Sequence, residues 1–178
     1  MFPLKKRVKL SSIPAENRWG AVRKHDVHTG VDLFAPDGTE IYAIEDGVVI
    51  DVSTFTGASI GLKWWAETMS CAVESKDKVI LYGELYRPCV EVGEEVKEGQ
   101  VIGLIKTVLL KDKGRPMSML HIEKYDHGYR GNPEVNYNIW DGWELDKEDK
   151  TKAGPKPKHL RNIEEVLDWE PEDELDWE

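Results

Sequence analysis

Short runs of apolar and β-branched residues, separated by turn residues, recur along the first 125 positions. Such runs are typical of β-strands, and glycine or Asp-Gly between two of them is typical of a turn. Before residue 158 no long segment has the apolar period of an amphipathic helix. The runs that predict strands are residues 41–44, 48–52, 71–74, 79–82, 90–105 and 119–125. We therefore expect an all-β domain of antiparallel sheet, in which turns join many short strands.

Two segments break this regular pattern. Residues 54–69 contain two glycines and the pair Trp64-Trp65, which predicts a long hairpin or an inserted loop. Exposed tryptophans there would either be binding anchors or cover the edge of the core. Residues 126–157 are polar and rich in turn residues, which indicates an irregular extension packed on the body or a linker.

The C-terminal segment predicts one short helix followed by an acidic tail. Leu160, Ile163, Val166 and Leu167 share one face at helical spacing. Residues 168–178 repeat the triplet Asp-Trp-Glu and contain no basic residue. We expect a solvated tail whose tryptophans are available to dock on a protein partner.

The net charge of the chain is concentrated in its C-terminal part. The 178 residues carry a formal net charge of −10. Residues 134–178 hold 15 acidic and 6 basic side chains, whereas residues 1–133 hold 19 acidic and 18 basic ones. A surface without a basic excess binds phosphate poorly, so this balance argues against a nucleic-acid partner. We expect a nearly neutral domain over residues 1–133 and a mostly irregular acidic extension over residues 134–178.

The sequence also argues against membrane-spanning and exported classes of protein. No window of 18 apolar residues is present, so we expect no transmembrane helix and no membrane partner. The basic residues near the N-terminus are not followed by an apolar stretch of signal-peptide length. Cys71 and Cys89 do not form a Cys-x-x-Cys pair, and without an export signal we expect both to be free thiols.

Three residues are candidates for metal chemistry. His28 lies four residues before Asp32, and Gly30 between them favours a loop that enters a strand over a helix. His121 lies between two apolar residues, in a run where positions 119, 121 and 123 would share one face of a strand. Two histidines and one aspartate can supply the three protein ligands of an open zinc site. By themselves, these residues are also explained by an ordinary His28–Asp32 hydrogen bond and a core histidine at position 121.

Several short motifs follow one another in a specific order between residues 2 and 133. They are Trp19-Gly20-Ala21-Val22-Arg23, His28-Thr29-Gly30-Val31-Asp32-Leu33, Gly38 to Ala43, Gly47-Val48-Val49, Tyr82-Gly83-Glu84-Leu85, Val92 to Gly103, Met119 to Glu123, and Asn132-Pro133. In this order and spacing the chain resembles the M23 (lysostaphin/LytM-type) zinc peptidases. The resemblance implies an antiparallel β-fold of the M23 peptidase or lipoyl-like hybrid type. It also implies that peptides of bacterial cell walls are the substrate.

The resemblance assigns roles to single residues. It implies that His28, Asp32 and His121 bind zinc, and all three are present. The family has two further active-site histidines that are not ligands, and at those positions this chain has Glu84 and Met119. A carboxylate can act as a general base, so Glu84 is the candidate catalytic residue. Methionine cannot carry a proton, so activity should fall by orders of magnitude unless another group compensates. The candidates for compensation are His25, His127, Tyr82, Tyr125 and Arg115.

Two functions are compatible with this pattern. In the first, the protein is a zinc-dependent endopeptidase with a divergent active site that hydrolyses peptide bonds of peptidoglycan, with Glu84 as base. In the second, it is a catalytically inactive M23-like domain whose zinc serves structure or binding. The complete ligand set favours the first function, and the absence of both further histidines favours the second. Without a signal peptide we expect the protein in the cytoplasm or in a phage particle.

Overall fold

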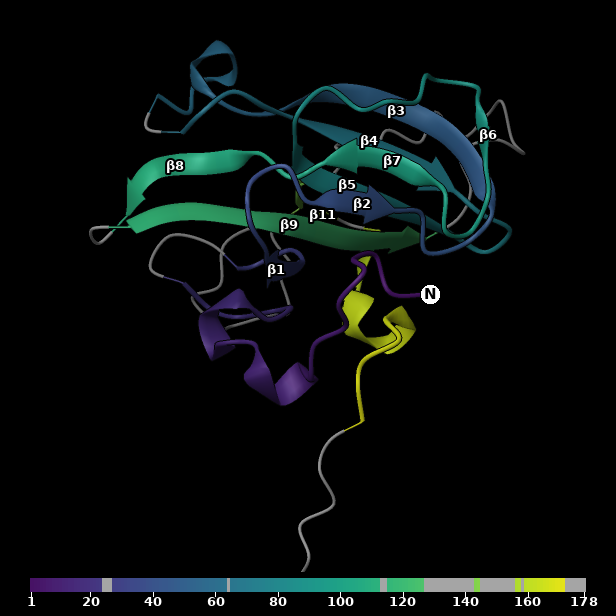
Figure 1. The fold of residues 1–178 in the computed structure, drawn as a ribbon, viewed down its shortest axis with the longest axis horizontal. Helices are drawn as coiled ribbons and strands as arrows, with labels where there is room; N and C mark the ends of the chain where they lie inside the picture. The colour runs from purple at the N-terminus through teal and green to yellow at the C-terminus, as the bar shows by residue number, and fades with distance from the viewer. Residues whose placement is uncertain are drawn as a thin grey trace, which may run out of the picture.

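The main body consists of one large antiparallel sheet and a small two-stranded sheet packed on it, and β10 and β11 form a separate two-stranded pair. The computed structural model describes residues 1–23, 27–63, 65–112, 115–126, 143–144, 156–157 and 159–171. The large sheet has the strand order β1-β9-β5-β4-β3-β6, and β8 and β12 also pair with β9. The small sheet pairs β2 with β7 and lies in front of β4 and β5 in Figure 1.

Most of the described chain lies in short strands and single helical turns. The strands are β1 Val31–Phe34, β2 Glu40–Tyr42, β3 Gly47–Thr56, β4 Thr68–Glu74, β5 Lys78–Leu85, β6 Glu95–Val96, β7 Val101–Leu104, β8 Thr107–Asp112, β9 Arg115–Asp126, β10 Trp143–Glu144, β11 Lys156–Pro157 and β12 Leu160–Arg161. The 3₁₀ helices are η1 Leu10–Ser12, η2 Ala15–Asn17, η3 Ala58–Ile60 and η4 Ile163–Val166. In the described ranges, no helix has the length and apolarity that a membrane span requires.

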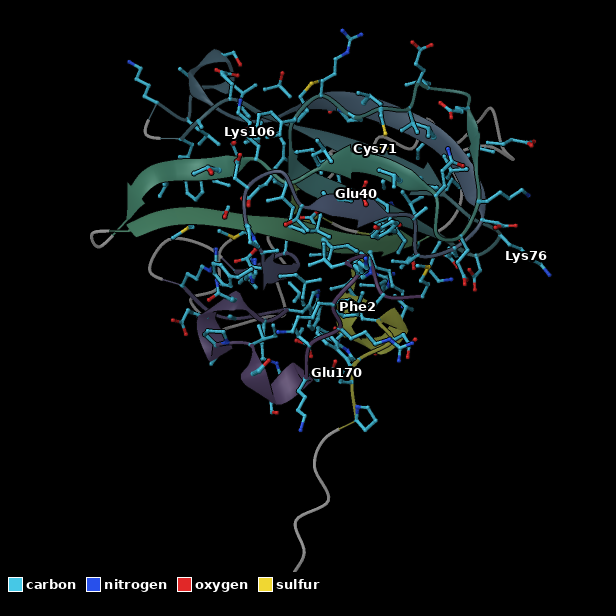
Figure 2. All side chains as sticks on the ribbon, viewed as in Figure 1. Phe2, Glu40, Cys71, Lys76, Lys106 and Glu170 are labelled. Carbon is cyan, nitrogen blue, oxygen red and sulfur yellow. The ribbon has the colours of Figure 1, made fainter. Side chains whose placement is uncertain are left out.

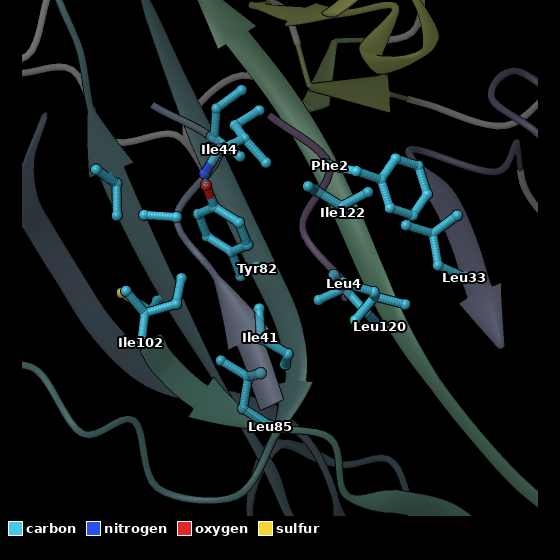
Figure 3. Packing of buried hydrophobic residues seen from close by; sticks show 14 of the residues in the cluster. Phe2, Leu4, Leu33, Ile41, Ile44, Tyr82, Leu85, Ile102, Leu120 and Ile122 are labelled. Atoms are coloured by element: carbon cyan, nitrogen blue, oxygen red, sulfur yellow. Dashed lines mark hydrogen bonds between the residues drawn. The ribbon is translucent and has the colours of Figure 1, made fainter. Parts of the chain in front are cut away.

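The prediction of an all-β, antiparallel domain is confirmed. Every pairing between named strands in the described residues is antiparallel. Figure 3 shows Ile41 and Ile102 of the small sheet facing the large sheet, with Tyr82 of β5 in the same buried cluster. The Tyr82 hydroxyl accepts a hydrogen bond from the backbone N–H of Ile44 at 3.0 Å. Apolar strand residues therefore form the core between the two sheets, and the central strands β4 and β5 are buried along nearly their whole length.

The segment that the sequence predicts to be a long hairpin or an inserted loop is a hairpin. β3 and β4 pair as far as Thr56 and Thr68, and residues 57–67 connect them. Trp65 in this connection is 36% exposed, and Trp64 lies outside the described residues. The connection therefore extends from the end of the sheet and is not part of the core.

The described C-terminal segment, residues 159–171, packs on the same body as the sheets. β12 pairs with the end of β9, and Ile163 and Leu167 are buried in the main core cluster. Trp169 packs edge-on against Phe2, with 5.5 Å between the ring centroids. Figures 1 and 2 show the N-terminal and C-terminal segments side by side below β9. Trp169 therefore docks on its own chain, whereas residues 172–178 lie outside the described residues.

The short helix predicted at residues 160–167 is not confirmed in the form expected. Leu160 lies in β12 and packs in a second cluster with Tyr125, whereas Ile163 and Leu167 pack in the main cluster. Because residues at helical spacing contact two different clusters, the chain forms a strand and then the four-residue 3₁₀ helix η4. The domain boundary after residue 133 stays a prediction, since most of residues 127–158 lie outside the described part.

The two cysteines are free thiols, as expected. Cys71 is fully buried within the sheets, where Figure 2 labels it, and Cys89 is exposed. Burial raises the pKa of the Cys71 thiol to about 12. A thiol with so high a pKa is almost entirely protonated at neutral pH and is a weak nucleophile.

Candidate metal centre

The pairing of β1 with β9 brings the predicted ligands together. In this register Asp32 lies directly opposite His121. His28 lies in the connection that leads into β1 and reaches the same point. The three residues are 3%, 5% and 7% exposed for His28, Asp32 and His121. Residues that are 89 positions apart in sequence therefore form one buried cluster.

Three side-chain atoms of this cluster converge. His28 Nε2 lies 3.0 Å from Asp32 Oδ1 and 3.2 Å from His121 Nδ1, and the last two atoms are 2.8 Å apart. The atoms form a nearly equilateral triangle, small enough for one ion to contact all three at bond lengths of about 2.0–2.2 Å. Two imidazole nitrogens and one carboxylate oxygen are a donor set that zinc commonly binds. The residues present therefore fit a zinc ion.

A backbone carbonyl sets the orientation of the His28 ring. His28 Nδ1 lies 2.9 Å from the carbonyl oxygen of Arg18. Because a carbonyl can only accept, Nδ1 carries the proton, and the lone pair of Nε2 points at the cluster. Two backbone hydrogen bonds of 2.9 Å, from Gly20 N to His28 O and from His28 N to Ala21 O, hold the residue against the same loop.

A buried carboxylate sets the orientation of the His121 ring. His121 Nε2 lies 2.9 Å from Glu123 Oε1, and the hydroxyls of Thr29 and Tyr125 both donate to the Glu123 carboxylate. Burial alone would raise the pKa of Glu123, but these hydrogen bonds outweigh it and leave the pKa below its usual value. The ionised carboxylate accepts from Nε2–H, so Nδ1 is the nitrogen directed at Asp32.

The charge balance around His121 also favours a cation at this point. Burial alone would lower the pKa of His121, but its hydrogen bonds to Asp32 and Glu123 outweigh burial and raise the pKa to about 10. The two carboxylates thus hold a positive charge at the imidazole. A metal ion bound at Nδ1 takes the place of a proton there, because ligand and proton compete for the same lone pair.

Two residues to which the sequence analysis gave no role hold the Asp32 carboxylate. Asp32 Oδ2 accepts from Asn17 Nδ2 at 2.8 Å and from Arg23 Nη2 at 3.2 Å. Burial alone would raise the pKa of Asp32, but the hydrogen bonds to His121 and His28 keep it well below the usual range. With Oδ2 engaged, Oδ1 remains directed at the two imidazoles. Arg23 lies in a motif of the family resemblance, whereas Asn17 has no signal in the sequence.

Gly30 lets the loop before β1 approach β9 closely. A Cβ atom at this position would lie 2.2 Å from the carbonyl oxygen of Ile122 and 2.9 Å from His121 Nε2. Real Cβ atoms do not approach other atoms so closely, so a larger residue would push the loop away. The glycine is therefore required for His28 and His121 to meet.

Glu84 lies at an irregularity in β5, next to the cluster. Met69 pairs with Leu85 and Cys71 with Tyr82, so β5 has one extra residue between these pairs, which is a β-bulge. Among the residues that the structure describes, Glu84 is the one non-glycine residue with a positive φ, at 67°. Such a conformation costs about 1 kcal/mol or more for a residue with a side chain. Bulges at active sites commonly redirect a side chain.

The Glu84 carboxyl group is buried and lacks a full set of partners. Glu84 is 5% exposed, and within the described residues nothing forms a hydrogen bond with its Oε2 atom. Burial raises its pKa to about 8, and the charges of His121 and Asp32 are near enough to influence it. Gly83 pairs with His121 across β5 and β9, which places the neighbouring Glu84 beside the cluster. A buried, incompletely satisfied carboxyl of raised pKa beside a metal-binding cluster is suited to proton transfer.

Met119, the second position at which the resemblance implies a histidine, lies on the same face of β9 as His121. It is 3% exposed and pairs with Phe34, two positions from the Asp32–His121 pair. Among the compensating groups, Tyr82 is bound to Ile44 in the core and does not reach the site. Tyr125 contacts the site through Glu123. His25, His127 and the side chain of Arg115 lie outside the described residues.

The aromatic ring of Phe55 covers one side of this cluster. Its centroid lies 5.5 Å from that of His121, and its ring atoms pack against Gly83. A Cβ at Gly83 would lie 2.6 Å from the ring, so the ring occupies the space that a side chain would fill. Phe55 had no distinguishing signal in the sequence, because its position depends on the course of the β3–β4 hairpin.

Comparison with known proteins places these motifs in a family. The model of peptidase family M23 matches residues 26–133. An uncharacterized metalloprotease from Buchnera aphidicola is 27% identical over 142 residues, which are 78% of this chain and 30% of that protein. The peptidoglycan DD-endopeptidase ShyC from Vibrio cholerae is 34% identical over 111 residues, which are 61% of this chain and 22% of that protein. The chain thus spans less than a third of the length of these relatives.

Among solved structures, the catalytic domain of the antimicrobial peptidase lysostaphin from Staphylococcus simulans is 20% identical, with a TM-score of 0.49, over 69% of this chain and 89% of that one.

The sequence match to the family model contains all three cluster residues, His28, Asp32 and His121, together with Glu84. Since this match extends over more than half of its residues, the chain belongs to peptidase family M23.

Proposed function

We propose that this chain is a zinc-dependent endopeptidase that hydrolyses peptide bonds of peptidoglycan. The observation that carries the proposal is the convergence of His28 Nε2, Asp32 Oδ1 and His121 Nδ1 on one point. Membership of a peptidase family supports hydrolysis of a peptide bond. The relative that acts on peptidoglycan supports the substrate class.

In this proposal His28, Asp32 and His121 hold the ion. A zinc ion with three protein ligands lowers the pKa of a bound water to about 7 and polarises a carbonyl group. In its ionised form, which the positive charge of a bound zinc ion would favour, Glu84 would take a proton from the attacking water at Oε2, an atom that no described donor occupies. Asn17 and Arg23 keep the Asp32 carboxylate in place. Positioned proton transfer of this kind contributes about 10²–10⁴-fold in rate.

One observation favours the alternative, a catalytically inactive M23-like domain that binds zinc for structure or recognition. Met119 is buried on the site face of β9, where the family has a histidine. Its thioether can neither donate a hydrogen bond to a developing oxyanion nor carry a proton. A protein of this kind would bind zinc and fold with it, yet would release no peptide fragments from peptidoglycan.

The deciding experiment compares four forms of the full chain: wild type, His121→Ala, Glu84→Gln and Glu95→Gln. Zinc content is measured by metal analysis, and digestion of purified peptidoglycan is measured by release of new amino groups. Glu95 is an exposed carboxylate on β6, so its variant controls for the loss of one negative charge.

The two functions predict different outcomes. The endopeptidase proposal predicts zinc and activity in wild type and Glu95→Gln, neither in His121→Ala, and zinc without appreciable activity in Glu84→Gln. Zinc binding with no chelator-sensitive digestion in wild type would favour the inactive domain. A folded wild type that binds no zinc would contradict both functions, and full activity in Glu84→Gln would remove Glu84 as the base.

A further inference from the structure

The C-terminal segment contacts the loop that holds one of the candidate metal ligands. Glu164, on η4, binds the guanidinium of Arg18 through both carboxylate oxygens, with 3.1 Å from Nε to Oε1 and 3.0 Å from Nη2 to Oε2. Oε1 also accepts from the backbone N–H of Trp19 at 3.2 Å. The Glu164 side chain is only 13% exposed. A bidentate arginine–carboxylate pair fixes the relative orientation of the two side chains and also stabilises their contact.

The same loop orients the metal ligand. The carbonyl oxygen of Arg18 accepts the Nδ1–H of His28 at 2.9 Å, and this bond directs Nε2 toward Asp32 and His121. The carbonyl belongs to the backbone, so its position depends on what holds residues 18 and 19. Glu164 binds both the side chain of Arg18 and the N–H of Trp19, on either side of that carbonyl.

Glu164 is itself held firmly. The side chain of Asn162 accepts from the Glu164 backbone N–H at 2.9 Å, and Trp169 Nε1 donates to the Glu164 carbonyl at 3.0 Å. The preceding residue, Ile163, is fully buried in the main core cluster. A carboxylate anchored in this way can act as a fixed support for the loop.

We propose that Glu164 is a positioning residue of the metal centre and acts on His28 through Arg18. The inference rests on the proposed zinc site, and it extends that site to residues 159–171, which lie outside the family match at residues 26–133. Hydrogen-bond partners of a ligating histidine typically change metal affinity about 10–100-fold when they are lost. Because Glu164 acts one residue further away, we expect the lower end of this range, about tenfold.

The test compares full-length wild type, Glu164→Gln and Glu165→Gln. Glutamine keeps the shape of glutamate but loses the charge that holds the guanidinium. Glu165 is the adjacent residue on η4, and its 65% exposed carboxylate pairs with Lys124, so Glu165→Gln is the matched control. Zinc affinity is measured by competition with a coloured chelator, the visible spectrum is recorded for the cobalt-substituted protein, and thermal unfolding is measured without metal.

The expected result is a zinc Kd about tenfold higher and altered cobalt bands for Glu164→Gln, with neither change for Glu165→Gln. If Glu164→Gln lowers only the stability of the metal-free protein and leaves the zinc Kd and cobalt bands unchanged, the segment is merely structural and the inference is wrong. Absence of zinc binding in wild type would contradict the proposed function and this inference with it. If Glu164→Gln does not fold, Arg18→Lys, which keeps the charge but loses the paired contact, must show the same two changes.

Discussion

Glu123 accepts a hydrogen bond from His121 Nε2 at 2.9 Å, and the two residues lie on one face of β9. The carboxylate fixes the ring and increases the basicity of Nδ1, as partners of ligating histidines do. We therefore predict that Glu123→Gln raises the zinc Kd by about 10–100-fold. Tyr125→Phe, which removes one donor to Glu123, should have a smaller effect in the same direction. An unchanged Kd in Glu123→Gln, measured by chelator competition, would contradict this role.

Zinc should stabilise the fold through His28, Asp32 and His121. A ligand that binds only the native state at about 100 times its Kd adds about 2.7 kcal/mol to the free energy of unfolding. We predict a higher Tm for wild type in zinc, reversed by chelator, and no zinc-dependent shift for His121→Ala. The same shift in the His121→Ala variant would mean that the metal binds elsewhere on the chain.

Introducing a histidine at position 119 should increase the proposed peptidase activity. Met119 and His121 share a face of β9, so an imidazole at 119 would lie beside the cluster. Since positioned proton transfer contributes about 10²–10⁴-fold, we predict that Met119→His raises kcat on peptidoglycan at least about tenfold. Met117→His, on the same strand and face but further from His121, is the control and should leave kcat unchanged. Equal rates in wild type and both variants would show that position 119 does not limit catalysis.

Glu84 should make the stability of the metal-free protein depend on pH. Burial raises the pKa of its carboxyl from 4.5 to about 8, so the folded state holds this proton more tightly than the unfolded state. Wild type should therefore lose stability relative to Glu84→Gln as pH rises from 4.5 to about 8, with a constant difference outside that window. At about 1.4 kcal/mol per pKa unit, the loss should be on the order of 5 kcal/mol. The free energy of unfolding of both proteins is measured by denaturant titration in chelator across this pH range. A difference between wild type and Glu84→Gln that does not change with pH would contradict the raised pKa of Glu84.

The C-terminal segment should contribute to global stability. Ile163 is fully buried in the main core cluster, so Ile163→Ala should lower the free energy of unfolding by about 2–5 kcal/mol. Ile60, in the β3–β4 hairpin, is 48% exposed, and Ile60→Ala should cost much less. Similar, small effects of both variants in denaturant unfolding would show that residues 159–171 are independent of the domain.

The strands were predictable because they follow from the local pattern of apolar and turn residues. The three cluster residues were predictable because they lie in short sequence motifs. β-branched runs and turn residues predicted the antiparallel sheet, and the family resemblance predicted that His28, Asp32 and His121 meet. The supporting residues were not predictable, because they depend on distant parts of the chain. Asn17 contacts Asp32 only after the N-terminal loop folds back, and Glu164 lies 146 positions from Arg18.

Two further features could not be predicted from the sequence. The register shift in β5 has no local signature, since Gly83-Glu84-Leu85 is also compatible with a regular strand. Apolar residues at helical spacing after residue 159 predicted a helix. In the structure Leu160 packs in one hydrophobic cluster, whereas Ile163 and Leu167 pack in another. In both cases the tertiary packing overrides the local preference of the chain.

The bulge at Glu84 has a consequence for the gene as well as for the protein. Glutamate codons, GAA and GAG, become the glycine codons GGA and GGG by a single base change. Glycine adopts a φ of 67° without steric cost, and it would remove the buried carboxyl at the same time. A copy of this gene that no longer needed the carboxylate would thus have a one-step mutational route to a more relaxed backbone. A glycine at position 84 in a related sequence would therefore indicate that the carboxylate is dispensable in that protein.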